Sequence, residues 1–309
     1  MSAPDRVMVG IDLGGTKVRA GIAVPDAPGA LAELERPTAS EGGRALVTQL
    51  AELVRDLCRE ASVPLDHLAA IGIGGAGVPD AGQGGFDQAP NLGDVSSVSL
   101  VDELRLAVGC PVVLDNDVNV AALGELAAGI GREHDDFAFV SIGTGIGMGL
   151  VLGRELVHGA GNAAGEIGYL PFGADPLDPA AHRRGALEEV VAGDALAARY
   201  APGATAREVF ARAADGDPRA VSALDEEARW IAHAIAAVDA IVDPGRVVLG
   251  GGIGSRPELL EAILGWLDRL GRGRLPVTIS ALGSAAPVLG ALRLASDAAT
   301  DRTHEGVPA

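Results

Sequence analysis

Apolar residues along this chain come in short runs that end at glycine-rich turns. Residues 7–24 form one such unit, in which two apolar runs flank the stretch GIDLGGTK at 10–17. Residues 137–152 form another, with the stretch GTGIG at 143–147 between its apolar runs. An apolar run, a glycine turn and a second apolar run predict a β-hairpin. Each half of the chain therefore contains one predicted hairpin of the same kind, which is a weak internal repeat.

The rest of the pattern predicts further strands and helices. Apolar residues at helical spacing, such as Leu46, Leu50 and Leu53, indicate the helices. The predicted helices span residues 43–61, 100–108, a stretch after 119, 185–196, 206–214, 218–242, 257–270 and 287–295. The further predicted strands span residues 31–36, 68–73, 111–114, 246–249 and 277–280. Residues 171–184 contain three prolines and are predicted to form a long loop.

Composition indicates the fold class and the cellular setting. Aromatic residues make up 3% of the 309, so Val, Leu, Ile and Ala must build the core, which suits an α/β protein with buried sheets. Cys58 and Cys110 lack metal-ligand spacing, which favours a reduced, cytoplasmic protein. The N-terminus does not read as a signal peptide, and no apolar run approaches the ~20 residues of a membrane span.

The net charge of −18 argues against nucleic acid and anionic membranes as partners. It does not exclude ATP, because a phosphate site needs only local hydrogen-bond donors and a metal ion.

The first glycine turn carries the residues that a phosphate site needs. Gly14 and Gly15 leave room for a phosphate to approach backbone N–H groups, and Thr16 and Lys17 add a hydroxyl and a cation. Asp12, at the strand end, is placed to hold Mg²⁺ directly or through water. The alternative is an ordinary hairpin turn. Because the second hairpin could grip the same polyphosphate, a phosphotransferase is the first hypothesis.

Other polar residues follow predicted strands or lie in loops. Asp115, Asn116, Asp117 and Asn119 come where a strand ends, the position at which open α/β sheets bind ligands, although one of them could merely cap the next helix. Asn91 lies in a loop, where most Asn residues are turn residues. Residues 72–77 match the dinucleotide-binding pattern G-x-G-x-x-G, but the helix that this pattern requires does not follow, so the match is rejected. Glu166 is an isolated carboxylate among small residues, and residues 250–253 form a third glycine turn.

Taken in order, these motifs resemble the ROK (repressor, open reading frame, kinase) family of sugar kinases. The motifs are D-x-G-G-T-K, P-N, N-D, G-T-G-x-G, A-G-E-x-G and D-P-x-x-V-V-L-G-G-G, and the resemblance covers residues 7–295. It implies a two-domain actin-like (ribonuclease-H-like) α/β ATPase fold that closes over an interdomain cleft. The expected domains are residues 1–116 and 117–286, with a C-terminal helix at about 287–299 packing back on the first. The resemblance also implies a homodimer and ATP- and Mg²⁺-dependent phosphorylation of a sugar hydroxyl.

The resemblance assigns roles to individual residues. Asp117 looks like the general base that takes the proton from the attacking hydroxyl, which fits the chemistry of phosphoryl transfer. The residues that look like sugar ligands are Asn91, Asn116, Asp117, Glu166 and Glu188. Those that look like the phosphate and metal clamp are Asp12, Gly14, Gly15, Thr16 and Lys17, together with Gly143, Thr144, Gly145 and Gly147. Gly251 and Gly252 are similar to the turn on which adenosine rests.

One departure from the family pattern concerns zinc. Many members hold a structural zinc with one His and three Cys, whereas this chain has Tyr169, Pro179, Ala181 and Ala186 at those positions. No structural zinc is therefore expected, and the loop at 171–184 is expected to lack a tether. Tyr169 could still donate a hydrogen bond to the substrate, which need not be glucose.

Several functions stay open. A hexose is the leading substrate, with an N-acylated amino sugar or a cyclitol as alternatives. A sugar-sensing transcriptional regulator would carry a DNA-binding module ahead of the first hairpin, where this sequence has only residues 1–6. A catalytically inactive sugar-binding protein is disfavoured by the presence of Asp12, Lys17 and Asp117.

Overall fold

The computed structural model of this chain describes residues 4, 6–25, 29–80, 85–87 and 99–305. The chain forms two compact units: unit 1 comprises Met1–Arg132 and Ser284–Ala309, and unit 2 comprises Glu133–Gly283. The units divide after Arg132, beyond the boundary at 116/117 that the sequence predicts, so that helix α3 belongs to unit 1. Within the described ranges, no helix is long and apolar enough to cross a membrane.

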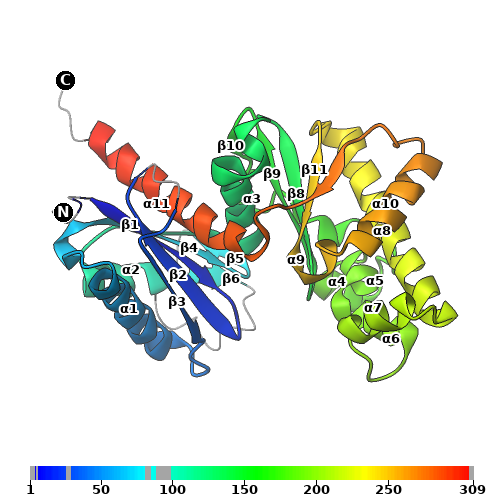
Figure 1. Ribbon diagram of the computed structural model, residues 1–309, viewed down its shortest axis with the longest axis horizontal. Coiled ribbons are helices and arrows are strands. Elements are labelled where there is room, and N and C mark those ends of the chain that lie inside the picture. Colours follow the sequence, from blue (N-terminus) through cyan, green and yellow to red (C-terminus); the bar gives the residue numbers. More distant parts are fainter. Residues whose placement is uncertain (1–3, 5, 26–28, 81–84, 88–98, 306–309) are drawn as a thin grey trace. The chain divides into compact units, whose positions relative to one another are not determined.

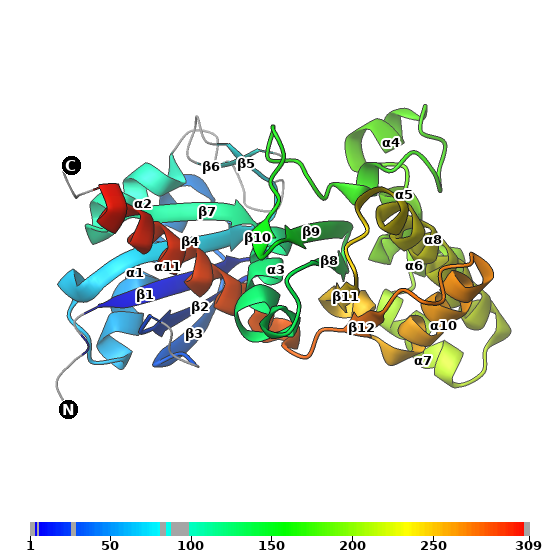
Figure 2. The ribbon, with the colours of Figure 1, turned by 90° about the horizontal axis from the view of Figure 1, so that it is seen from above.

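Unit 1 is built on a five-stranded sheet with the order β3-β2-β1-β4-β7 (Figure 2). The first predicted hairpin is confirmed as the antiparallel pair β1 and β2, whereas β4 and β7 run parallel to β1. The elements of unit 1 are β1 (Val7–Leu13), β2 (Lys17–Ala23), β3 (Ala32–Pro37), α1 (Gly43–Glu60), β4 (Leu68–Gly75), β5 (Val78–Asp80), β6 (Gly85–Asp87), α2 (Leu100–Val108), β7 (Val112–Asn116), α3 (Asp117–Ala128) and α11 (Ala286–Glu305).

Alternation along β1 divides its side chains between the two faces of this sheet. Val9 and Ile11 belong to the core shared with α1 and α2, whereas Met8 belongs to a smaller core shared with Leu292 of α11. Helix α11 therefore covers the opposite face, where Figures 1 and 2 show it (red) lying along the sheet. Gly10 makes this approach possible, because a Cβ there would lie 2.5 Å from the backbone nitrogen of Leu292.

Helices α3 and α11 pack with their backbones in close approach. A Cβ on Gly290 would lie 1.6 Å from the carbonyl oxygen of Val120, and a Cβ on Gly124 would lie 2.1 Å from that of Ala286. Real Cβ atoms essentially never come this close to another heavy atom, so each site of contact requires glycine. This packing explains why α3 belongs to unit 1, although it follows the predicted boundary in the sequence.

Unit 2 has a five-stranded sheet with the order β10-β9-β8-β11-β12, and the second predicted hairpin is confirmed as the antiparallel pair β8 and β9. Its core forms between β8, β9 and β11 and the helices α6, α7, α8 and α10, which Figure 2 shows grouped beside one another. The elements of unit 2 are β8 (Phe137–Ile142), β9 (Ile146–Leu152), β10 (Glu155–Leu156), α4 (Pro179–Arg184), α5 (Glu188–Val191), α6 (Gly193–Tyr200), α7 (Ala206–Ala214), α8 (Pro218–Val242), β11 (Val247–Gly250), α9 (Gly251–Gly254), α10 (Pro257–Arg269) and β12 (Val277–Ile279).

The core of unit 2 contains one fully buried carboxyl group, that of Glu227 on α8. Its Oε2 lies 3.1 Å from Nη1 of Arg199, while its Oε1 has no hydrogen-bond partner. Desolvation raises the pKa of Glu227 to about 8, and the nearby charge of Glu226 adds to the rise, although Arg199 opposes it. The folded chain therefore holds a proton on Glu227 at pH values where the unfolded chain has released it.

This raised pKa predicts that the protein loses stability as the pH rises. The ordinary pKa of the group is 4.5, so between about pH 4.5 and pH 8 the unfolded state binds fewer protons than the folded state. The free energy of unfolding should then fall by up to about 1.4 kcal/mol per pH unit over this window. Glu227→Gln has no proton to lose there, so its stability relative to wild type should rise with pH. Urea unfolding of both proteins at pH 6, 7 and 8 measures this difference, and parallel pH curves would contradict the assignment.

Candidate functional site

The turn between β1 and β2 presents residues 15–17 to solvent. Behind them, the Gly14 N–H donates to the carbonyl of Lys17 (3.1 Å), and the Thr38 hydroxyl donates to the carbonyl of Gly14 (2.6 Å). The Lys17 ammonium lies 3.0 Å from Oε2 of Glu35, and about half of each side chain is exposed. The turn is thus anchored within unit 1, while the residues predicted to bind phosphate stay accessible to an anion.

Asp12, the predicted metal ligand, forms an ion pair with Arg19 of β2. Its Oδ2 accepts hydrogen bonds from Nε (3.1 Å) and Nη2 (2.5 Å) of Arg19, whose Nη1 donates to the carbonyl of Ser284 (2.7 Å). The Asp12 side chain is 17% exposed, so it can still reach a ligand.

A single carboxylate beside a phosphate-type turn is a donor set that Mg²⁺ accepts, since this ion keeps several waters and takes substrate phosphates as ligands. Arg19 contacts only Oδ2 of Asp12, so Oδ1 or an intervening water can hold the ion. In the part of the chain that the structure describes, no three His, Cys, Asp or Glu side chains gather as a metal site. Waters and phosphate oxygens would therefore have to complete the coordination of an ion at Asp12.

Asn116, predicted to bind sugar, caps helix α3. Its Oδ1 accepts from the N–H groups of Val118 (2.9 Å) and Asn119 (3.3 Å), and its Nδ2 donates to the carbonyl of Gly77 (3.1 Å). The capping alternative therefore describes this side chain. Asp117 is the first residue of α3 and is half-buried, where the backbone N–H groups of the first turn favour a negative charge.

The register of the unit 1 sheet relates Asp117 to the first glycine turn. Leu13, Gly75 and Asn116 lie side by side across the parallel strands β1, β4 and β7. The turn after β1 and Asp117 after β7 therefore leave the same edge of the sheet, roughly 10 Å apart at the strand spacing of ~4.8 Å. Open α/β sheets bind their ligands at this edge.

The second and third glycine turns meet in unit 2. Gly250 of β11 pairs with Ser141 of β8, so the turns that follow these two parallel strands leave the sheet together. Gly251 has a φ of 78°, and a Cβ there would lie 2.3 Å from the carbonyl oxygen of Ile142, so only glycine fits. The residues that this arrangement brings together are Gly143, Thr144, Gly145, Gly251 and Gly252, whereas Gly147 lies within β9.

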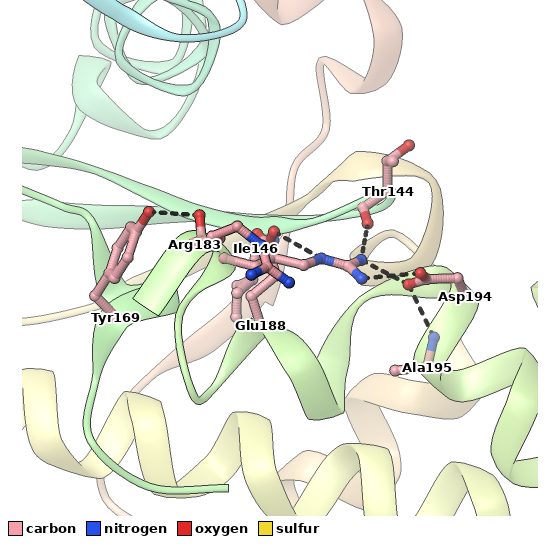
Figure 3. Close-up of polar contacts among 8 residues, drawn as sticks. Thr144, Ile146, Tyr169, Arg183, Glu188, Asp194 and Ala195 are labelled. Atoms are coloured by element: carbon pink, nitrogen blue, oxygen red, sulfur yellow. Dashed lines mark hydrogen bonds and ion pairs between the residues drawn. The ribbon is translucent and has the colours of Figure 1, made fainter. Parts of the chain in front are cut away.

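Glu166 follows a glycine that is held against β9. Gly165 has a φ of 95°, and a Cβ there would lie 1.9 Å from the carbonyl oxygen of Met148. Desolvation raises the pKa of Glu166, and the negative charge of Glu188 raises it further. Two predicted sugar ligands of unit 2 therefore influence each other electrostatically. Tyr169 is 45% exposed, and its hydroxyl donates to the carbonyl of Arg183 (3.0 Å; Figure 3).

Glu188, the first residue of α5, lies against the second glycine turn (Figure 3). Its Oε2 accepts from the Ile146 N–H (2.9 Å) and its Oε1 from Nε of Arg184 (3.2 Å). Sequence reasoning did not single out Arg184. No helical spacing indicates this pair, because α4 ends at Arg184 and Glu188 begins α5, so the two residues are four apart without sharing a helix.

The chain at 171–184 is not the untethered loop that the sequence predicts. It contains helix α4, whose N-terminus is capped by Asp178 through the Ala180 N–H (2.8 Å). The Ala174 N–H donates to the carbonyl of Ala186 (3.0 Å), and Arg184 anchors the end of the segment. The prediction of a loop is confirmed for residues 171–178, which lie outside helices and strands. It was wrong for residues 179–184, because the three prolines suggested irregular structure, whereas Pro179 occupies a position at which helices accept proline.

Comparison with known proteins identifies the family. The model of the ROK family matches residues 8–298. This chain belongs to the ROK family.

Proteins similar to this chain include an N-acetylmannosamine kinase from Shigella flexneri, 33% identical over 254 residues that cover 80% of this chain and 83% of the relative. A ROK hexokinase from Thermus thermophilus is 34% identical, with a TM-score of 0.82 over 96% of this chain and 99% of its own. A ROK glucokinase from Streptomyces griseus, solved with glucose and AMPPNP, is 29% identical, with a TM-score of 0.76 over 94% and 99%. The two structures confirm the predicted actin-like α/β fold.

The predicted site residues of this ROK protein are distributed over both units. Asp12, the turn at 14–17, Asn116 and Asp117 belong to unit 1. The residues of unit 2 are Gly143, Thr144, Gly145, Gly147, Glu166, Tyr169, Glu188, Gly251 and Gly252. Asn91 lies outside the described residues.

Proposed function

We propose that this protein is an ATP-dependent carbohydrate kinase that phosphorylates a hydroxyl of a hexose such as glucose, with Asp117 as the general base. The observation that carries the proposal is the position of Asp117, which begins α3 at the same sheet edge from which the first glycine turn leaves. The S. griseus glucokinase, solved with glucose and AMPPNP, supports ATP and a hexose as the substrates.

In the proposed reaction, the hydroxyl oxygen of the sugar attacks the γ-phosphorus of ATP. The hydroxyl proton passes to the Asp117 carboxylate, the bond between the γ-phosphorus and the β–γ bridging oxygen breaks, and ADP leaves. The backbone N–H groups of the glycine turns and the Lys17 ammonium orient the phosphates. Asp12 would hold Mg²⁺, which neutralises phosphate charge when bound.

The sugar ligands are proposed to include Glu166, Tyr169 and Glu188 from unit 2, together with Asn91. For Asn116 we propose chiefly an orienting role, because its amide group already binds the first turn of α3 and the carbonyl of Gly77. A sugar hydroxyl can replace the Arg183 carbonyl as the partner of Tyr169, since that side chain is partly exposed.

An N-acylated amino sugar is the second candidate substrate, favoured by the N-acetylmannosamine kinase that is 33% identical. A coupled assay of ADP release with glucose, mannose, N-acetylmannosamine and a cyclitol tests both candidates, with Asp117→Asn as the negative control. Glucose as the best substrate supports the proposal, and N-acetylmannosamine as the best supports the second candidate. Sugar binding without ADP release from any compound would instead support a non-catalytic sugar-binding protein.

We also propose that this protein contains no structural zinc, because Tyr169, Pro179, Ala181 and Ala186 stand at the positions of the family's zinc ligands. Elemental analysis of the purified protein should find less than 0.1 zinc per chain (about one-tenth of a site), and a strong zinc chelator should leave its melting temperature unchanged. One tightly bound zinc per chain would contradict this prediction.

A homodimer is proposed from the family resemblance alone, and analytical ultracentrifugation tests it.

A further inference from the structure

The carboxylate of Glu188 is seated in the second glycine turn. Its Oε2 accepts the Ile146 N–H at 2.9 Å, and a Cβ on Gly145 would lie 2.3 Å from this same oxygen. Glycine at position 145 therefore leaves the space that the carboxylate occupies. A residue proposed to bind sugar thus also contacts the turn proposed to bind phosphate.

Arg184 holds this carboxylate from its other side (Figure 3). Its Nε donates to Oε1 of Glu188 (3.2 Å), and its Nη1 and Nη2 donate to Oδ2 (2.9 Å) and Oδ1 (2.6 Å) of Asp194. Nη2 also lies 3.5 Å from the carbonyl oxygen of Thr144, within the turn itself. One planar guanidinium therefore engages two carboxylates and the turn, which a lysine ammonium cannot reproduce.

Asp194 connects the same cluster to the start of helix α6. It is in the first turn of α6, and its Oδ1 also accepts the N–H of Ala195 (2.9 Å). The preceding residue, Gly193, donates its N–H to the carbonyl of Gly143 (2.9 Å), at the beginning of the glycine turn. One end of the turn is thus bonded to Glu188 and the other to Gly193, the neighbour of Asp194. Arg184 contacts both Glu188 and Asp194.

One guanidinium and two carboxyl groups form this cluster beside a proposed anion site. The hydrogen bonds to Asp194 raise the pKa of Arg184, and the same bonds lower the pKa of Asp194. Arg184 and Asp194 therefore stay ionised at neutral pH. Without Arg184, two carboxylates would face the turn with no counter-charge, and they would repel the phosphates of a nucleotide.

We propose that Arg184 is a positioning residue that holds Glu188 against the second glycine turn and keeps that turn in its nucleotide-binding conformation. The inference rests on the proposed function for the identity of the ligand. Through Arg184, the carboxylate of Glu188, a proposed sugar ligand, is connected to the second glycine turn, which is proposed to bind phosphate. A change at Arg184 therefore affects nucleotide binding, although Arg184 is not proposed to contact the nucleotide.

Calorimetry of the full chain with Mg²⁺-AMPPNP, in the absence of sugar, tests the proposal. Arg184→Met is expected to raise the dissociation constant at least tenfold, because it removes both the tether and the counter-charge. Arg184→Lys keeps the charge but cannot make the paired hydrogen bonds of the guanidinium to Asp194, so the dissociation constant is expected to rise by only about threefold to fivefold. The matched control is Arg183→Met, which removes an exposed guanidinium one residue earlier and should change the constant less than twofold.

A double variant separates the two effects of Arg184, which are the tether on Glu188 and the counter-charge. If Arg184 acts by balancing Glu188, then Arg184→Met combined with Glu188→Gln should bind AMPPNP more tightly than Arg184→Met alone. Binding by Arg184→Met within twofold of wild type overturns the proposal. Recovery in the double variant supports the counter-charge as the cause of the weakening, and no recovery supports the tether. Should Arg184→Met fail to fold, Asp194→Asn carries the same test, with a threefold to tenfold weakening expected and unchanged binding overturning it.

Hydrogen exchange of the nucleotide-free protein measures how well the backbone N–H groups of the second glycine turn are protected. This measurement does not depend on the kinase proposal. The Ile146 N–H, which Glu188 accepts, should exchange at least tenfold faster in Arg184→Lys than in Arg183→Met. If wild type fails to bind AMPPNP but shows this difference, the proposed function fails and the positioning role stands. Equal exchange in the two variants overturns the positioning role, whatever the nucleotide result.

Discussion

Asp117→Asn is expected to lower the turnover number by about 10²–10⁴-fold, the range typical of losing a general base. The amide keeps the size of the side chain and most of its hydrogen bonding, but it cannot accept the proton of the sugar hydroxyl. Sugar binding should therefore stay within about tenfold of wild type. Steady-state kinetics on the best substrate of the panel, with calorimetric binding of the same sugar, measures both quantities.

The matched control for this prediction is Asp66→Asn, which removes an exposed carboxylate from the same unit, far along the chain from the glycine turns. Its turnover should equal that of wild type. Near wild-type turnover in Asp117→Asn would place the base elsewhere and remove the main support for the Asn116-Asp117 assignment. Loss of sugar binding together with turnover would instead indicate that Asp117 is a substrate ligand whose charge is needed for binding.

Gly290→Ala is expected to reduce the free energy of unfolding by about 3 kcal/mol, at the upper end of what overpacking costs. The added Cβ would lie 1.6 Å from the carbonyl oxygen of Val120 and 2.7 Å from the backbone nitrogen of Gly124. Both contacts are with helix backbone, so no flexible side chain can move to relieve them. Helices α3 and α11 must then separate, which also displaces Asp117 at the start of α3.

Urea unfolding followed by circular dichroism measures this loss. The control is Gly265→Ala, an exposed position within α10 where an added Cβ meets nothing within 4 Å. There the substitution should raise stability by about 0.5–1 kcal/mol, because alanine is the better helix former. If Gly290→Ala were as stable as Gly265→Ala, the close approach of α3 and α11 would be wrong.

Local pattern was sufficient to predict most elements of both units. The helix predicted at 218–242 is α8, and the one predicted at 100–108 is α2, because long apolar periodicity determines which face of a helix is buried. The helix predicted at 185–196 is divided into α5 and α6, which end and begin beside Ala192. The C-terminal helix extends to Glu305, beyond the predicted end at 299, as polar residues also form helix when the preceding turns are anchored.

The sequence by itself determined the two glycine hairpins, the order of the motifs and hence the family, because backbone freedom at glycine and alternation of apolar residues act over a few neighbouring positions. Only the tertiary structure decided how the polar side chains are used. Asn116 caps a helix, Asp12 pairs with Arg19, and Arg184 joins Glu188 to the second glycine turn. A hydrogen bond between side chains depends on distances and directions set by the whole unit. Residue type and spacing therefore indicate which groups are present, and the packed fold decides which of them meet.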